Sequence, residues 1–257
     1  MTRVLETRTG GVLRLTINRP EVRNALDGAT YRGLTAALAA ADADAEIAAV
    51  VLTGAGGHFT AGNDLKDFQQ PREGEDRPAA AFLRQLAAFG KPLIAAVEGS
   101  AVGIGVTLLL HCDFVYAGDT ARFRMPFVPL GLTPEGGSSL LLPKLVGVRK
   151  ARDWLLRGRA FDTVEALDAG LLTGAVAAGT ALAEAEKVAQ ELAGLPAEAV
   201  RLTKAMLHGR ERSDLSDTLA EEFVIFSARL HSAEAQAAFA GFFAAREVPS
   251  PQTDATT

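Results

Sequence analysis

Short apolar runs of strand length recur along the first half of this chain, and segments with helical spacing lie between them. The runs cover residues 12–18, 48–53, 93–97 and 113–117. Their β-branched and apolar content favours strands, and strands that are apolar on both faces need helices to cover them. This alternation is typical of an α/β fold with buried, largely parallel strands. We therefore predict the α/β class.

After Pro134 the pattern changes, and helical segments follow one another. They cover residues 136–146, 149–157, 163–169, 181–193, 197–207 and a long stretch from 215 to about 246. Proline begins helices and ends preceding ones, so Leu195-Pro196 marks a boundary. We predict a sheet-rich region over residues 1–195 and a helical region over residues 196–257.

Charge and composition argue against several classes of protein. A net charge of -5 and a pI of about 5.5 argue against a nucleic-acid partner, which calls for a basic face. There is no run of about 18 apolar residues that predicts a membrane span, so no membrane partner is expected. Cys112 is the single cysteine, which excludes a disulfide within the chain. With no apolar signal core near the N-terminus, we expect a cytoplasmic protein.

Several common cofactor chemistries also lack their sequence signals. The four histidines are far apart and show no ligand spacing, so no metal site is predicted: His58, His111, His208 and His231. The chain has neither a phosphate-binding loop motif nor a dinucleotide fingerprint. It also lacks the nucleophile elbow of serine hydrolases. We therefore expect no bound cofactor.

Two glycine-rich segments, residues 58–65 and 98–107, each follow an apolar run. Small residues let backbone N–H groups face a ligand without obstruction, and the second segment opens a helix whose N-terminus favours negative charge. Together the segments could build an oxyanion hole. The alternative from spacing alone is that both are tight turns between a strand and a helix.

A third segment, residues 130–139, contains a carboxylate at a predicted helix start. Thr133 resembles an N-cap and Pro134 the first helical residue, which places Glu135 in the first turn. The helix dipole favours a glutamate there without any catalytic role. Structural and catalytic interpretations of Glu135 both remain open on these residues.

Taken in order, these segments resemble the enoyl-CoA hydratase/isomerase, or crotonase, family over nearly the whole chain. Residues 59–65 resemble the first oxyanion-hole motif and residues 98–117 the second. Residues 18–20 and 24–26 resemble the N-terminal turn that contacts coenzyme A. The closing helix is matched by residues 232–235 with Phe239, Phe242 and Phe243.

The resemblance implies a fold and a site. The fold would be a crotonase-like ββα spiral core over residues 1–195 carrying an acyl-CoA site, with residues 196–257 as a helical trimerisation region. The partners would be an acyl-CoA substrate and further copies of the chain, as a homotrimer or a dimer of trimers. The N–H groups of Ala61 and Ile104 would hold the thioester oxygen. The substrate-binding residues would be Arg23, Ala25, Asn63, Asp64, Leu65, Phe127 and Leu132.

The acid and base positions indicate the reaction. Hydratases of this family use two glutamates, and the matching positions here are Thr107 and Phe127. Glu135 instead matches the single catalytic glutamate of the Δ3,Δ2-enoyl-CoA isomerases. The resemblance therefore predicts an isomerase in which coenzyme A belongs to the substrate and no other cofactor takes part. An apolar wall of Phe127, Leu130 and Leu132 would raise the pKa of Glu135, against the effect of the helix dipole.

Three alternatives stay open at this point. The first is enoyl-CoA hydration or another CoA-thioester reaction on the same scaffold. The second is a non-catalytic acyl-CoA binder in which Glu135 only starts a helix. The third is RNA binding, which is disfavoured because the chain has no lysine-rich run. Lys66, Arg84 and Lys204 are candidates for contacts with the CoA phosphates.

Overall fold

The computed structural model describes residues 2–68, 78–209 and 212–247. Its main element is a six-stranded sheet in the order β1-β2-β3-β4-β6-β9. The strands are β1 (Val4–Thr9), β2 (Val12–Ile17), β3 (Ala49–Gly54), β4 (Leu93–Val97), β6 (Phe114–Gly118) and β9 (Gly174–Val176). β1 and β2 form an antiparallel hairpin, and the other neighbours are parallel. The predicted α/β class with buried parallel strands is confirmed.

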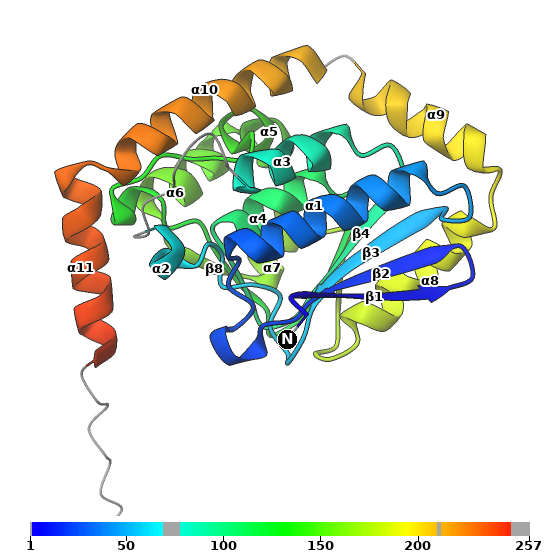
Figure 1. The fold of residues 1–257 in the computed structure, drawn as a ribbon, viewed down its shortest axis with the longest axis horizontal. Helices are drawn as coiled ribbons and strands as arrows, with labels where there is room; N and C mark the ends of the chain where they lie inside the picture. The colour runs from blue at the N-terminus through cyan, green and yellow to red at the C-terminus, as the bar shows by residue number, and fades with distance from the viewer. Residues whose placement is uncertain (1, 69–77, 210–211, 248–257) are drawn as a thin grey trace, which may run out of the picture.

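Helices cover both faces of this sheet (Figure 1). On one face lie α1 (Gly28–Ala43) and α3 (Pro78–Ala88), which pack against each other, and α8 (Ala181–Ala193) lies on the other. The side chains of successive residues in β3 point to opposite faces of the sheet. Val50 and Leu52 join the main core, whereas Val51 joins the cluster under α8. This two-sided burial explains why β3 and β4 are apolar without alternation.

A second, three-stranded sheet lies beyond the end of β4. It comprises β5 (Ser100–Val102), β7 (Arg122–Arg124) and β8 (Ala160–Asp162). β5 follows β4 after two residues and leads into α4 (Ile104–Thr107) and the 3-10 helix η2 (Leu108–His111). The second glycine-rich segment opens a helix as predicted, and that helix tightens to a 3-10 helix after one turn. The second glycine-rich segment therefore leads from the end of β4 in the main sheet, through β5, to the buried first residues of α4.

The remaining core elements are short helices between the strands. They are η1 (Pro20–Val22), α2 (Leu65–Phe68), η3 (Val128–Leu130), α5 (Ser138–Val146), α6 (Val148–Arg157) and α7 (Thr163–Asp168). α5 and α6 pack together, and η3 contacts α6 and the C-terminal helix α11 (Ala233–Glu247). The loop between η3 and α5 contains Glu135.

Three helices after residue 196 form an outer arc around the core (Figure 1). They are α9 (Ala197–His208), α10 (Arg212–Leu230) and α11. The stretch from 215 to 246 was predicted as a single helix, but the chain breaks at residues 231–232. Ser232 there accepts a hydrogen bond from the Ala235 N–H at 3.2 Å, which starts α11. None of the described helices is long and apolar enough to cross a bilayer.

Candidate active site

The two glycine-rich segments meet directly in the structure. Thr60 pairs with β5, since its N–H donates to the Ser100 carbonyl at 2.9 Å and its carbonyl accepts from the Val102 N–H at 3.1 Å. Gly62 has a φ of 85°, and a Cβ on it would lie 2.5 Å from the Val102 carbonyl oxygen. The contact is therefore too close for any side chain at this position. The predicted convergence of the two segments is present in the fold.

The Ile104 N–H is available to a ligand. Ile104 is the first residue of α4, and its side chain is fully buried in the main core. Among the described residues no acceptor pairs with this N–H. The first N–H groups of a helix lack partners within the helix and carry its positive dipole end, although α4 is only one turn long.

The predicted donor Ala61 is not available, and the structure corrects it. The Ala61 N–H donates to the Arg23 carbonyl at 2.9 Å. The same edge continues with Leu26 N–H to the Gly62 carbonyl and Asp64 N–H to the Leu26 carbonyl. In an extended chain, successive backbone N–H groups point to opposite sides. The N–H groups of residues 61 and 64 and the Gly62 carbonyl face residues 23–26, so the Asn63 N–H points away from them. It pairs with no acceptor among the described residues, so Asn63 supplies the available donor in this segment.

Glu135 lies against the second segment. Its side chain is 7% exposed, and its Oε1 accepts a hydrogen bond from the Thr107 hydroxyl at 2.5 Å. Thr107 is three residues after Ile104, so one turn of α4 separates the free N–H from the residue that holds the carboxyl group. Thr107 thus links the buried carboxyl group to the helix that begins with the free Ile104 N–H.

The helix start predicted around Glu135 is wrong by several residues. α5 begins at Ser138 with Gly137 as its N-cap, so Thr133 is not a cap and Glu135 lies in the loop before the helix. The buried Thr133 hydroxyl has no hydrogen-bond partner among the described residues. Gly136 and Gly137 have φ of 71° and 74°, which interrupts the helical backbone after Glu135.

Burial decides the protonation of Glu135. Burial, together with the negative charge of Glu222, raises the pKa of the carboxyl group from an ordinary value of 4.5 to about 8. The hydrogen bond from Thr107 acts in the opposite direction. The sequence left open whether apolar surroundings, which raise the pKa of Glu135, or the helix dipole, which lowers it, would dominate. Burial dominates in the structure. A carboxyl group with a pKa near neutrality can both accept and return a proton.

The other predicted substrate-binding residues differ in their exposure and in their hydrogen bonds. Arg23 is exposed, with a left-handed φ of 52°, and Ala25 is buried behind it. Leu65 is half-buried at the start of α2. The Asp64 carboxylate is not free, because Arg19 pairs with it at 3.0 Å. The Asn63 side-chain oxygen is likewise engaged, since it accepts from the Tyr31 hydroxyl at 2.5 Å.

Phe127 and Leu132 belong to the apolar wall that was predicted from the sequence. Both are buried, and the Phe127 ring lies edge-on to Phe226 of α10 at a centroid distance of 6.5 Å. A Cβ on Gly103 would lie 3.9 Å from the Phe127 ring, which places that ring beside the second glycine-rich segment. These contacts place Phe127 between the second glycine-rich segment and α10.

Sequence reasoning missed Glu222 of α10. Its carboxylate accepts hydrogen bonds from the Gly137 N–H at 2.6 Å and the Ser139 N–H at 2.9 Å. Glu222 is 85 positions from Gly137 along the chain, and no motif marks it. Only its position in the interior of a helix, close to aromatic residues, could have suggested burial.

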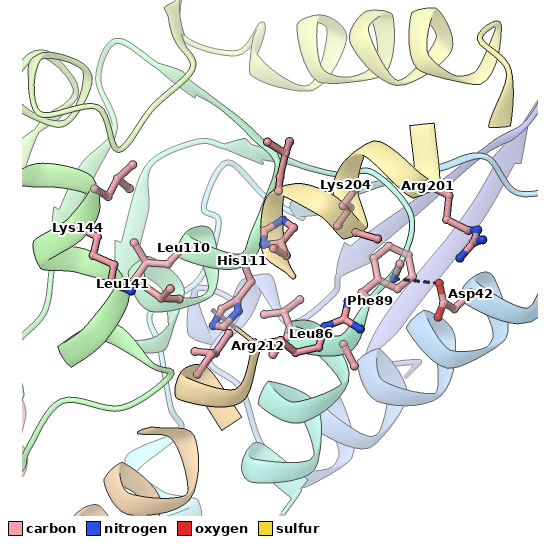
Figure 2. A pocket seen from close by; sticks show the side chains of 18 residues that line it. Asp42, Leu86, Phe89, Leu110, His111, Leu141, Lys144, Arg201, Lys204 and Arg212 are labelled. Atoms are coloured by element: carbon pink, nitrogen blue, oxygen red, sulfur yellow. Dashed lines mark hydrogen bonds between the residues drawn. The ribbon is translucent and has the colours of Figure 1, made fainter. Parts of the chain in front are cut away.

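A separate cavity of about 530 Å³ lies between α3, η2, α5, α9 and the start of α10 (Figure 2). None of the predicted catalytic or substrate-binding residues is among the described residues that line it. Lys204 lines this cavity, where it pairs with Asp113 at 2.7 Å. His111 connects the cavity to the site, because its Nε2 donates to the Gly136 carbonyl at 2.8 Å. Among the described residues, no group of three potential ligands could hold a metal ion.

Comparison with known proteins finds relatives over nearly the whole chain. The family model for enoyl-CoA hydratase/isomerase matches residues 7–250. The chain is 38% identical over 244 residues to human enoyl-CoA delta isomerase 2, covering 92% of this chain and 62% of that protein. It is 35% identical over 231 residues to the 2,3-dehydroadipyl-CoA hydratase of Escherichia coli, covering 88% and 90%.

A solved structure shows the same fold. The enoyl-CoA hydratase/isomerase from Pseudoalteromonas atlantica superimposes with a TM-score of 0.92 at 41% identity, covering 96% of this chain and 99% of that one. By contrast, the chain spans about three fifths of the length of the human isomerase. The relatives therefore include both isomerases and hydratases, and their names do not distinguish between the two reactions.

Proposed function

The chain belongs to the enoyl-CoA hydratase/isomerase family, and from this premise we propose that it shifts the double bond of a 3-enoyl-CoA to the 2-trans position. The fold is the crotonase fold and the family's substrates are acyl-CoA thioesters. One observation carries the choice of reaction. Glu135 is a buried carboxyl group that accepts a hydrogen bond from Thr107, and Thr107 lies on the same short helix as the free Ile104 N–H.

In the proposed mechanism the thioester oxygen accepts hydrogen bonds from the Asn63 and Ile104 N–H groups. Ionised Glu135 removes a proton from C2, and the electron pair moves toward the thioester oxygen to form a dienolate. The preorganised donors stabilise this developing charge. Protonated Glu135 then delivers the proton to C4, and the double bond forms between C2 and C3. One carboxyl group serves both steps, and no water is consumed.

The surroundings of Glu135 offer little support for hydration. Addition of water needs one group to activate the water and another to protonate carbon. The hydratase positions hold Thr107 and Phe127, neither of which can act as a base. Glu222 is the other carboxylate near Glu135, but both of its oxygens already accept backbone N–H groups. A single-carboxylate proton shift suits this arrangement better.

Paired assays on a 3-enoyl-CoA and a 2-trans-enoyl-CoA test the proposal. We expect the absorbance of the conjugated enoyl thioester to rise with the first substrate and to stay constant with the second. Loss of absorbance with the second would support hydration, which is the reaction named for the Escherichia coli relative. Tight binding of both thioesters without turnover would instead support the alternative of a non-catalytic binder.

We also propose that residues 196–257 act as a trimerisation region, which gives a homotrimer or a dimer of trimers. α9 and α10 leave large apolar side chains exposed, with Met206 at 80%, Leu207 at 78% and Val224 at 67%. Large apolar side chains left exposed on helices of this kind are typical of interfaces. Sedimentation of the purified protein is expected to give three or six times the chain mass of 26.9 kDa, and a monomer would contradict the proposal.

A further inference from the structure

Glu222 is a buried charge on an otherwise peripheral helix. α10 has 19 residues, and Glu222, at 7% exposure, is its one residue in the buried class. Its neighbour Glu221 is exposed. An ionised carboxylate is costly to bury unless hydrogen bonds compensate. A helix that buries its glutamate and exposes Val224 and Ile225 therefore places this carboxylate for a specific contact.

The contact is the start of α5. Gly137 caps that helix but has no side chain to accept its N–H groups, and Glu222 supplies the missing acceptor from another helix. Its Oε2 accepts from Gly137 and its Oε1 from Ser139, so both oxygens are used. Charge-assisted bonds at a helix N-terminus are among the stronger hydrogen bonds in proteins.

These bonds hold the turn that carries Glu135. The Ser138 hydroxyl donates to the Glu135 carbonyl at 2.7 Å, so the helix start is tied directly to that residue. On the other side, His111 holds the Gly136 carbonyl. Gly136 and Gly137 both have positive φ, and glycine backbones have no intrinsic preference that would keep them there. Contacts from outside must therefore define the conformation of the turn.

α10 also packs against this turn. A Cβ on Gly137 would lie 2.5 Å from Cδ1 of Leu215, so Gly137 permits the close approach that brings Glu222 within bonding distance. Gly137 and Glu222 therefore complement each other. Gly137 leaves room for α10 to pack closely, and Glu222 accepts the N–H groups that no side chain at position 137 accepts.

We propose that Glu222 is a positioning residue, through which the C-terminal helical region holds the Glu135 turn in the geometry for proton transfer. The role rests on the proposed function of Glu135 and extends the active site into residues 196–257. Glu222 itself touches no substrate. It acts through the Gly137 and Ser139 N–H groups, and its negative charge favours the protonated form of Glu135.

The test compares Glu222→Gln with Glu221→Gln, which removes a charge from the exposed neighbouring position. Hydrogen exchange of peptides that cover residues 135–146 is measured first, without substrate. Loss of a hydrogen bond to a charged group should speed exchange at the start of α5 by roughly tenfold or more in Glu222→Gln. Glu221→Gln should match the wild type. Unchanged exchange in Glu222→Gln overturns the proposal.

Steady-state kinetics with a 3-enoyl-CoA distinguish positioning from a purely structural cap. We expect Glu222→Gln to lower kcat by about tenfold or more with little change in KM, since misplacement of a catalytic group affects the chemical step. The acidic limb of its pH profile should move to lower pH, because the charge that raises the pKa of Glu135 is gone. Faster exchange with unchanged kcat and pH profile contradicts the positioning role.

A second variant distinguishes the effect of the charge from that of the side-chain length. It also keeps the proposal testable if Glu222→Gln folds poorly. Glu222→Asp keeps the charge but shortens the side chain by one methylene, so kcat should fall while the acidic limb stays near its wild-type position. If the acidic limb of the pH profile moves as far in Glu222→Asp as in Glu222→Gln, the proposal is contradicted. If the wild type does not isomerise at all, the proposed function fails, and the exchange data alone decide whether Glu222 holds the turn.

Discussion

Replacement of Glu135 with Gln is expected to lower kcat on a 3-enoyl-CoA by about 10² to 10⁴-fold, the usual contribution of a general acid–base group. Gln keeps the size of the side chain and an oxygen that can accept from Thr107, but it cannot take a proton from C2. The dissociation constant of the thioester should stay within a few-fold, since the proposed oxyanion donors are backbone groups. Stopped-flow turnover and calorimetric binding measure the two quantities.

The pH dependence of the wild type gives an independent check. Glu135 must be ionised to act as a base, and its pKa is raised to about 8. We therefore expect kcat/KM to rise with pH and to level off above about 8. A profile that is flat between pH 5 and 9 would show that no buried carboxyl group of this kind controls the step.

Stability provides the control for folding of Glu135→Gln. A carboxyl group whose pKa rises from 4.5 unfolded to about 8 folded destabilises the protein when it is ionised. The penalty is absent below pH 4.5, grows between these values and is complete above pH 8, at up to about 5 kcal/mol. Glu135→Gln should thus unfold at a higher temperature than the wild type at pH 9 but not at pH 4.5. A lower melting temperature at both pH values contradicts this account.

Gly62→Ala is expected to have the second largest effect, with a loss of about 10² to 10³ in kcat, as for removal of one oxyanion donor. Gly62 has a positive φ, and its added Cβ would lie 2.5 Å from the backbone carbonyl of Val102. The carbonyl cannot rotate away as a side chain could, so the segment must shift. Such a shift would move the neighbouring Asn63 N–H, so that it and the Ile104 N–H could no longer bind the same thioester oxygen.

The matched control is Gly57→Ala. Gly57 has a similar φ of 76°, but no atom lies within 4 Å of its added Cβ. Both variants therefore carry the backbone strain of alanine in the left-handed region, and only Gly62→Ala adds the clash. Equal losses of kcat in the two variants would assign the effect to strain rather than to the donor. Thermal unfolding of both shows whether each remains folded at the assay temperature.

The candidate site was predictable only in part. Ile104 and Glu135 follow from motifs, because a helix start after a glycine and a glutamate in a matching segment are local features of the sequence. Ala61 was chosen on the same grounds, yet its N–H pairs with Arg23, whereas the Asn63 N–H stays free. Which of two neighbouring N–H groups is free depends on the register with residues 23–26. That register is set by a contact between separate segments.

Glu135 illustrates the same limit. Its residue type was evident, but its loop position and raised pKa were not, since they result from Gly136, Gly137 and the burial produced by packing. Glu222 matched no motif, because its partners are two backbone groups far away in the chain.

By itself, the sequence determined the α/β class and the buried parallel strands, because periodicity acts over a few residues. The segments proposed to form the site were chosen through the resemblance to the family, since glycine spacing alone fitted tight turns equally well. Tertiary structure alone decided which backbone donors are free, how deeply Glu135 is buried and which carboxylate holds its turn. Those properties depend on hydrogen-bond partners and on exclusion of water, which arise only when distant segments pack against one another.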